Sequence, residues 1–503
     1  MPIRVRSVLT ILACAAGLSI VAAANSSPDS ARSELQLELG DLLLADERYW
    51  EAMVAYNQAK VGAKPAQLLR ASTGLLHSLL RVAEFSRAYH EALFLGDLGS
   101  PDPEVRVLQA DALWASGLFE EAEQLYAEIL ADVPTSVAAR HGHARGLAAR
   151  GHVDEALVEV RAVVGGSNER PEFYHTLGSI YRRLNRYPEA ADAFEEYVER
   201  LPKVRVSRQT EWARSEVLFL RSFGDRVPFD VLGDPARIHT IPFRLVNDKV
   251  VVRGRVNGHD LTDLVVDTGA EQMVLSQETA VATGVRAITT TISAGVGEVG
   301  IRGLDSGRVD TLEIGTFEIH NVSAIIKNPP LDGLPPTRVR DSISPVAFGL
   351  SAVIDYENQY VVLARRLPDE PADIELPMRV NRLAVVRGVV NESHPRSFVV
   401  DTGGEVVSLS FGTAGSLGLV PPRHIPLRVH GTSGWDQHAF LLPGVQLAFD
   451  KILYNNFSVV VLNLHRPSAL LGFHIGGIVG HTFLRNYRVS IDVDRSVLRL
   501  TRL

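Results

Sequence analysis

LVVDTGA at residues 264–270 and FVVDTGG at residues 398–404 are two copies of one pattern, and their repetition is the strongest structural signal in the chain. In each copy three apolar residues precede an aspartate, Asp267 or Asp401, and a Thr-Gly turn follows the aspartate. A single Asp-Thr-Gly means little, because Asp and Gly both favour turns. A charge at the end of an apolar strand costs free energy unless something satisfies it. Two such carboxylates therefore indicate a function for both.

The two copies occupy equivalent places in a longer duplicated unit. VVRGRVN at residues 251–257 recurs as VVRGVVN at residues 385–391, and in both copies the aspartate follows ten residues after the Asn. Short runs of Val, Ile and Leu, separated by Gly, Asn and Asp, are typical of strands and turns. The sequence therefore predicts two β-rich units in tandem, at residues 238–366 and 377–503, joined by a Pro- and acid-rich link at 367–377.

Two further aspartates lie at the far ends of these units. Asp355 and Asp492 follow their Asp-Thr-Gly aspartates by 88 and 91 residues, and each precedes a final apolar strand. Since these strands lie far along the chain from the turns, we interpret both carboxylates as structural.

The first part of the chain has a helical period instead. Ala122, Ala156 and Ala190 are 34 residues apart, and each follows a small residue by twelve positions. Small residues let paired helices approach closely, and larger neighbours fill the groove between them. The spacing resembles the tetratricopeptide repeat, which implies an all-α solenoid over residues 33–223, with a capping helix at 206–223. Such a domain is either a spacer or a docking surface for a protein partner, because fold alone does not set function.

The N-terminus has the features of a targeting segment. Two arginines precede an apolar run of small residues at 7–24, which ends in three alanines. This pattern is typical of a secretory signal peptide, so we expect residues 1–24 to be removed and the protein to be secreted or periplasmic. Two alternatives stay open: an uncleaved membrane anchor, since 18 apolar residues almost span a bilayer, or a lipid on Cys14.

Composition argues against several function classes. The net charge is −8 and no basic stripe is present, which disfavours DNA, RNA and anionic membrane surfaces as partners. Cys14 is the only cysteine, so removal of the targeting segment would leave no disulfide and no thiolate metal site. His141 and His143 lack a third ligand nearby, and no phosphate loop or metalloprotease motif occurs. We therefore expect neither metal nor cofactor.

The duplicated units resemble aspartic peptidases of the retropepsin-like and pepsin-like group. The resemblance is carried by VVDTGA at residues 265–270 and by GIVGHTFL at residues 477–484, followed by VSID at residues 489–492. It implies two all-β acid-protease-like lobes that pair about a two-fold axis within one chain. The fold class expected for the whole chain is therefore multidomain, an all-α tetratricopeptide-type solenoid followed by two such lobes.

The same resemblance implies roles for the residues of the repeated pattern. Asp267 and Asp401 would be the catalytic pair of an aspartic-type endopeptidase, activating a water molecule to hydrolyse a peptide or protein substrate. The residues that support the pair would be Thr268 and Thr402, through hydrogen bonds, and Gly269 and Gly403, through close approach of backbone amides to the carboxylates.

Two glycine-rich stretches stand where the family carries flaps over the substrate. Gly295 and Gly297 would belong to the first flap, and Gly431 and Gly434 to the second. Each stretch is as readily explained as an ordinary hairpin turn.

The chain also departs from the family pattern. Residues 340–343, RDSI, align in the first unit with GIVG at residues 477–480, so a supporting glycine is absent. Gly404 stands where Ala, Ser or Thr is common in the family. These changes motivate a second hypothesis, in which the chain is a catalytically decayed protein that binds peptides or serves as a scaffold.

Overall fold

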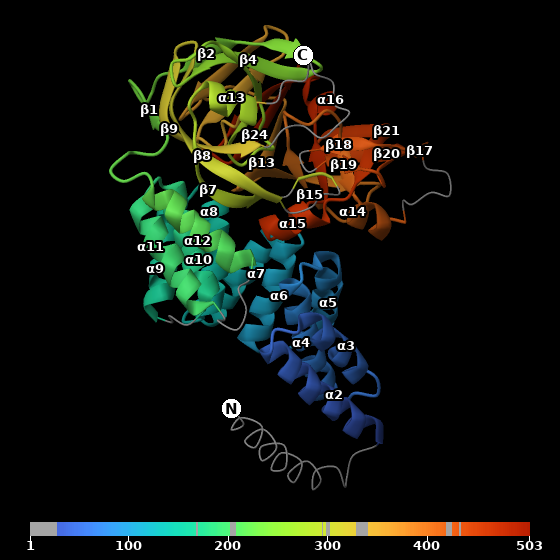
Figure 1. The fold of residues 1–503 in the computed structure, drawn as a ribbon. Helices are drawn as coiled ribbons and strands as arrows, with labels where there is room; N and C mark the ends of the chain where they lie inside the picture. The colour runs from blue at the N-terminus through green and yellow to red at the C-terminus, as the bar shows by residue number, and fades with distance from the viewer. Residues whose placement is uncertain are drawn as a thin grey trace. The chain divides into compact units, whose positions relative to one another are not determined.

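The computed structural model describes residues 28–166, 170–201, 208–293, 295–297, 302–327, 341–418, 425–431 and 434–503. The expected signal peptide, residues 1–24, and Cys14 lie outside the described residues. Helices fill the first part of the sequence and strands dominate the last (Figure 1). None of the helices in the described part of the chain combines the length and hydrophobicity that a membrane span requires. The chain divides into two compact units, residues 1–116 and 117–503.

The first unit consists of paired helices around a small-residue seam. Tyr56 is fully buried, and a Cβ atom on Gly40 or on Gly74 would overlap its ring. Glycine at these two positions therefore lets the neighbouring helices close on the tyrosine. The helices of this unit are α2 (Pro28–Ala45), α3 (Tyr49–Ala59), α4 (Pro65–Arg81), α5 (Phe85–Leu98) and α6 (Pro103–Ala115).

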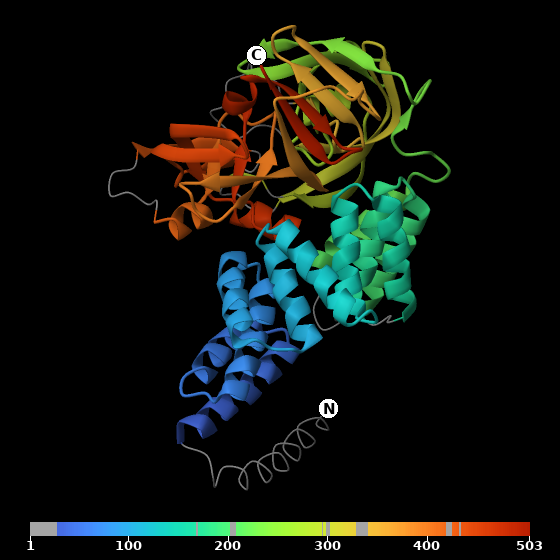
Figure 2. The same ribbon diagram turned by 180° about the vertical axis from the view of Figure 1, so that it is seen from behind.

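The second unit combines the remaining long helices with the strands. These helices are α7 (Phe119–Asp132), α8 (Val137–Ala149), α9 (Val153–Gly166), α10 (Pro171–Arg183), α11 (Tyr187–Arg200) and α12 (Arg208–Arg221). Helix α12 lies against strand β7 and α8 against β13 (Figure 1). Figure 2 shows the same ribbon from behind, with the teal helices of this unit next to the strands. The expected capping helix at 206–223 corresponds to α12.

The boundary between the compact units differs from the boundary expected at residue 223. It falls between Ser116 and Gly117, inside the helical repeats. The physical reason is a shared core, because Tyr187 and Phe223 belong to the same buried cluster as Val309 of the sheet. The helices from α7 onward are thus packed with the strands as one body.

Most strands of the first β-rich unit, together with β1 just before it, form one sheet. Its order is β1-β9-β6-β10-β5-β4-β8-β7, with β3 paired to β4. The bounds are β1 (Asp230–Val231), β3 (Arg244–Val246), β4 (Lys249–Val256), β5 (Thr262–Val266), β6 (Met273–Ser276), β7 (Ala287–Ser293), β8 (Arg302–Ile314), β9 (Phe317–Lys327) and β10 (Asp341–Ile343).

A second sheet contains strands of both β-rich units. Its order is β17-β20-β21-β16-β22-β15-β14-β13-β24-β23-β11-β12-β2. Strands of the first unit are β2 (His239–Pro242), β11 (Ser351–Asp355) and β12 (Tyr360–Ala364). Those of the second are β13 (Ile374–Asn381), β14 (Leu383–Val390), β15 (Arg396–Val400), β16 (Ser408–Ser410), β17 (Ile425–Pro426), β20 (Phe440–Phe449), β21 (Ile452–Leu462), β22 (Gly477–Val479), β23 (Tyr487–Asp492) and β24 (Val497–Arg502).

The duplication in sequence is matched by a duplication in strand pairing. Strand β5 lies between antiparallel β4 and parallel β10, and β15 lies in the same way between β14 and β22. Likewise β6 pairs with β9 in parallel and with β10 in antiparallel, as β16 does with β21 and β22. The two Asp-Thr-Gly turns therefore leave equivalent central strands.

The strand register corrects the expected alignment of the first unit by one residue. Asp341 lies opposite Leu264, as Gly477 lies opposite Phe398, so residues 341–344 rather than 340–343 match residues 477–480. Ser344 therefore takes the place of Gly480. It is fully buried, and its hydroxyl accepts a hydrogen bond from the backbone N–H of Ala347.

Candidate active site

Asp267 and Asp401 are positioned by the ends of the two equivalent strands. The backbone N–H of Asp267 donates to the carbonyl of Ile343 at 2.8 Å, and that of Asp401 donates to Val479 at 3.0 Å. Both acceptors end the parallel neighbour strand, β10 or β22. Ser344 thus leaves this contact intact in the first copy.

Thr268 and Thr402 join the two turns to each other. The hydroxyl of Thr268 donates to the carbonyl of Val400, and that of Thr402 donates to Val266, both at 2.7 Å. Each hydroxyl also accepts from the backbone N–H of the other threonine at 3.1 Å. Both side chains are fully buried. Four hydrogen bonds in a reciprocal arrangement therefore hold the turns together.

Gly269 and Gly403 bring the two carboxyl groups to one place. The N–H of Gly269 donates to Oδ1 of Asp267 at 3.0 Å, and that of Gly403 donates to Oδ1 of Asp401 at 2.9 Å. A Cβ atom on Gly269 would overlap the carboxyl of Asp401, and one on Gly403 would overlap that of Asp267. Each glycine therefore lies directly against the aspartate of the opposite turn.

The loop after Asp401 has additional support. Gly404 donates a second backbone hydrogen bond to Oδ1 of Asp401 at 2.8 Å. The carbonyl of Gly404 accepts from the N–H of His481 at 2.8 Å, and that of Glu405 accepts from Thr482 at 3.0 Å. A Cβ atom on Gly480 would overlap the carbonyl of Val406. The closing segment thus holds the second loop through close backbone contact.

The environment of Asp401 favours its protonated form. Burial, followed by the charge of Asp267, raises the pKa of Asp401 to about 7, although the N–H of Gly404 and the charge of Lys249 act in the opposite direction. Two carboxyl groups this close do not ionise together readily, and the resulting titration belongs to the pair. Asp401 therefore retains a proton at pH values below about 7.

Lys249 is a residue of this site that the sequence reasoning missed. Its ammonium group donates to the carbonyl of Gly403 at 2.7 Å. The register places Val251 opposite Val265 and Val385 opposite Val399, so Leu383 is the counterpart of Lys249 in the second copy. A charged residue where the other copy has leucine was the available signal.

The two glycine-rich stretches meet each other. A Cβ atom on Gly431 would overlap the carbonyl of Val296, which stands between Gly295 and Gly297. Strand β18 (Val429–Gly431) pairs with β19 (Gly434–Asp436) as a short hairpin. Residues 294 and 298–301 of the first stretch lie outside the described residues. The second stretch therefore forms a hairpin and also contacts the first stretch.

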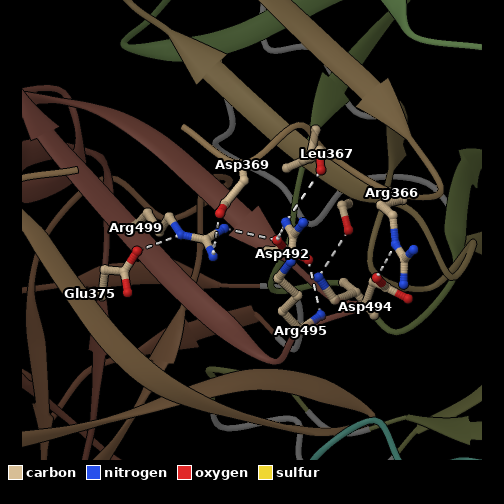
Figure 3. Close-up of polar contacts among 10 residues, drawn as sticks. Arg366, Leu367, Asp369, Glu375, Asp492, Asp494, Arg495 and Arg499 are labelled. Carbon is tan, nitrogen blue, oxygen red and sulfur yellow. Dashed lines mark hydrogen bonds and ion pairs between the residues drawn. The ribbon is translucent and has the colours of Figure 1, made fainter. Parts of the chain in front are cut away.

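Asp355 and Asp492 lie outside this site, in ion-pair networks of their own. Asp492 is fully buried and accepts from Arg495 and Arg499, both at 2.9 Å (Figure 3). Burial would raise the pKa of Asp492, but the hydrogen bonds from these arginines outweigh it and hold the pKa below its ordinary value. Asp355 accepts from the backbone N–H of Asn358 and lies 3.5 Å from Arg488. These contacts support the structural interpretation.

Other polar features of the described residues lie apart from the pair. Nε2 of His141 is hydrogen-bonded to the hydroxyl of Thr176 at 2.8 Å on the helices. Among the described residues, no group of three His, Cys, Asp or Glu side chains is arranged to hold a metal ion. A pocket of about 220 Å³ is lined by residues including Tyr360, Arg488 and Arg499, and by neither Asp267 nor Asp401.

Comparison with protein families agrees with both parts of this architecture. Residues 252–334 match the model described as gag-polyprotein putative aspartyl protease, which marks a retropepsin-like domain. Residues 82–137 and 141–204 match the model described as tetratricopeptide repeat. The chain is therefore a helical tetratricopeptide-repeat solenoid followed by a β-rich region with an aspartyl-protease-like domain. The protease match includes Asp267 and ends before Asp401.

Comparison with solved structures returns tetratricopeptide-repeat proteins. A thermophilic one from Thermus thermophilus is 18% identical, with a TM-score of 0.32, over 38% of this chain and 99% of its own. One from Parabacteroides merdae ATCC 43184 is 16% identical, with a TM-score of 0.32, over 41% and 78%. The pilF protein of Pseudomonas aeruginosa is 14% identical, with a TM-score of 0.30, over 40% and 88%. Comparison with curated proteins gives no match.

Proposed function

We propose that this protein is an aspartic-type endopeptidase whose catalytic pair is Asp267 and Asp401 of a single chain. The observation that carries the proposal is the reciprocal packing of the two turns, in which each glycine lies against the opposite carboxyl group. Asp-Thr-Gly turns in unrelated loops would have no reason to exchange contacts in this way. The match of residues 252–334 to an aspartyl protease model is independent support.

We further propose that residues 238–366 and 377–503 are two acid-protease-like lobes, each contributing one aspartate. The support is the repeated strand pairing, in which β5 and β15 occupy equivalent central positions. Val296 and Gly431, in contact with each other, would then belong to flaps that close over a bound peptide from both lobes.

The chemistry follows from one proton shared between two carboxyl groups. The ionised carboxylate takes a proton from a water molecule, whose oxygen forms a bond to the carbonyl carbon of the substrate peptide. The protonated carboxyl group donates a hydrogen bond to the carbonyl oxygen. When the C–N bond breaks, a proton passes to the leaving amine. Backbone N–H groups of Gly269 and Gly403 hold the two carboxyl groups in orientation throughout.

The departures from the family pattern are compatible with this chemistry. Ser344, in the place of a glycine, still leaves the backbone hydrogen bond between Asp267 and Ile343. At Gly404 a Cβ atom would overlap Oδ2 of Asp401, so glycine suits this loop. These contacts favour catalysis over the decayed, peptide-binding alternative.

For the remaining parts of the chain we propose docking and export. Tetratricopeptide repeats generally bind proteins, so the helical solenoid would recruit a protein partner or the substrate itself. Residues 1–24 would direct the chain to the periplasm or outside the cell, and the anchored forms, by an uncleaved N-terminus or a lipid on Cys14, are the alternatives.

The decisive experiment is cleavage of a peptide library by the purified full chain, beside Asp267→Asn, Asp401→Asn and the double variant. We expect each single variant to lose several orders of magnitude in kcat, and the double variant to lose no more, because the pair acts as a unit. The matched control is Asp450→Asn, at an exposed turn position, which should keep full activity.

Binding of a statine-type transition-state mimic separates the two hypotheses. An active enzyme should bind the mimic tightly and lose this affinity in either aspartate variant. If Asp401→Asn kept most of the activity, the assigned pair would be wrong. If the wild-type protein neither cleaved peptides nor bound the mimic, the non-catalytic hypothesis would replace this one.

A further inference from the structure

Lys249 connects the first β-rich unit to the second aspartate loop. It is the first residue of β4, and its ammonium group donates to the carbonyl of Gly403, which lies 154 residues away in sequence. The N–H of the same glycine donates to Oδ1 of Asp401 at 2.9 Å. Gly403 therefore binds the carboxylate of Asp401 through its backbone N–H and binds Lys249 through its backbone carbonyl.

The position of Lys249 also gives its charge access to the aspartate pair. Burial and the charge of Asp267 raise the pKa of Asp401, whereas the charge of Lys249 acts to lower it. An ammonium is a compact point charge with three donors, so it can hold a carbonyl oxygen and still act electrostatically on a neighbouring carboxyl group.

Two other cations around β4 share a carboxylate partner. Arg244 of β3 and Arg253 of β4 both pair with Asp263 of β5. On the β8 side, Arg255 lies opposite Glu313 in the strand register.

Two more charged groups lie at the start of β4 and near the second loop. Asp248 lies 3.7 Å from Arg485, and His481 is buried beside them. Burial lowers the pKa of His481, Asp248 opposes this, and Arg485 and Lys249 lower it further. At the first loop, Glu271 is paired with Arg382. Lys249 thus donates a hydrogen bond to the backbone of the second loop, and its charge acts on Asp401.

We propose that Lys249 is a positioning residue for the aspartate pair: its ammonium group fixes the second Asp-Thr-Gly loop and sets the pH range in which the two carboxyl groups share one proton. This inference rests on the proposed function, because only in an aspartic peptidase does the shared proton take part in catalysis. Neither the repeated pattern nor the family match assigns a role to this lysine.

The direction of the effect follows from the sign of the charge. A nearby cation stabilises every deprotonated form of the pair, so it lowers both apparent pKa values. Removing the charge should raise both. Because catalysis requires the form with one proton, the acidic and the basic limbs of the activity profile should both shift to higher pH when Lys249 is neutralised.

The experiment compares Lys249→Met, Lys249→Gln and Lys249→Arg in the full chain. The methionine removes charge and donor, the glutamine keeps a donor without the charge, and the arginine keeps both. We expect both limbs of kcat/KM to move upward by on the order of one pH unit in the first two variants, and to return close to wild type in the third. The same substitution at an exposed lysine, Lys451→Met, should leave the profile unchanged.

A second readout does not depend on turnover. Infrared spectra of the protein carrying ¹³C-labelled aspartate report the protonated carboxyl of Asp401, which can be assigned by its loss in Asp401→Asn. Its titration should move to higher pH in Lys249→Met and Lys249→Gln. If the wild type neither cleaves peptides nor binds the statine-type mimic, the proposed function fails, yet this titration still tests the lysine.

Three results would overturn the inference. The first is an infrared titration of Asp401 that is the same in Lys249→Met and wild type. The second is a change in stability or kcat with both pH limbs unmoved, which would assign Lys249 a structural contact only. A shift in Lys249→Met that Lys249→Gln does not reproduce would attribute the effect to the hydrogen bond and would equally contradict the role of the charge.

Discussion

Thr268 and Thr402 exchange the same hydrogen bonds in both directions, each hydroxyl accepting from the other's backbone N–H at 3.1 Å while donating across to the opposite strand at 2.7 Å. Neither side chain is exposed. These hydrogen bonds therefore connect two buried turns that are 134 residues apart. Because the two threonines have equivalent contacts, replacing either one tests the same interaction.

Replacing one of these threonines by valine should destabilise the protein strongly. Thr268→Val leaves the N–H of Thr402 and the carbonyl of Val400 buried without their partner, at a cost of about 1–3 kcal/mol for each unsatisfied group. Urea denaturation of Thr268→Val and Thr402→Val measures the loss. Thr290→Val, at an exposed strand position, is the matched control. If the buried and exposed substitutions lower the free energy of unfolding equally, the threonine hydrogen bonds have no energetic role.

The raised pKa of Asp401 predicts that the folded state becomes less stable as the pH rises. Its pKa is about 7 in the folded protein, against an ordinary value of 3.8, so between these values the native state retains a proton that the unfolded chain has released. The associated stabilisation is complete below the lower value and is lost as the pH rises through the upper one. Each unit of difference corresponds to about 1.4 kcal/mol.

The test is the pH dependence of the free energy of unfolding. Asn cannot ionise, so Asp401→Asn should show a flatter dependence than wild type between pH 3.8 and about pH 7. Asp450→Asn removes an exposed carboxylate and should leave the slope unchanged. Parallel curves for wild type and Asp401→Asn would contradict the raised pKa.

The ion pair between Glu123 of α7 and Arg379 of β13 should be essential to the packing of helices on strands. Its two hydrogen bonds measure 2.8 and 2.9 Å, and the side chains are only 10% and 13% exposed. Arg379→Met leaves a buried carboxylate without this partner, and we expect a loss of about 3–5 kcal/mol in the free energy of unfolding. Adding Glu123→Gln should recover part of it.

A neighbouring exposed pair supplies the control for this prediction. Arg387 of β14 contacts Glu120 and Glu121 of the same helix, with its side chain 41% exposed. Because exposed pairs are worth about 0–1 kcal/mol, Arg387→Met should have little effect. Equal losses for Arg379→Met and Arg387→Met would show that burial of the first pair is unimportant.

Export with removal of residues 1–24 can be checked on the mature protein. N-terminal sequencing of protein from the extracellular or periplasmic fraction should begin at Asn25, because three alanines precede it. An intact Met1 in the cytoplasm would refute export. A lipidated Cys14 would replace soluble release by an anchor.

The parts of the fold and site that could be predicted from the sequence are those that repeat within it. The 34-residue period predicted a tetratricopeptide solenoid, and the two Asp-Thr-Gly copies predicted a β-rich region, because both patterns recur in the chain itself. Features that occur once were harder to predict, and the only signal for Lys249 was a charged residue where the second copy has Leu383. Lys249 touches Gly403 across 154 residues, and no local pattern encodes such a distance.

Long-range packing explains the other differences. Sequence periodicity locates helices and strands but not their neighbours, so the shared core of Tyr187 and Val309, which moves the compact boundary to residue 116, was not foreseen. The pairing of β11 with β23 likewise joins residues more than a hundred positions apart. The alignment of the first closing segment was wrong by one residue because only strand register fixes it.

The pairing of β11 with β23 has a consequence for how the pair of aspartates assembles. An active site built from two identical subunits forms and falls apart with protein concentration. Here the strands from both β-rich units are tethered in one polypeptide and hydrogen-bonded in one sheet, so their encounter is intramolecular. Dilution should therefore leave the fraction of assembled sites unchanged.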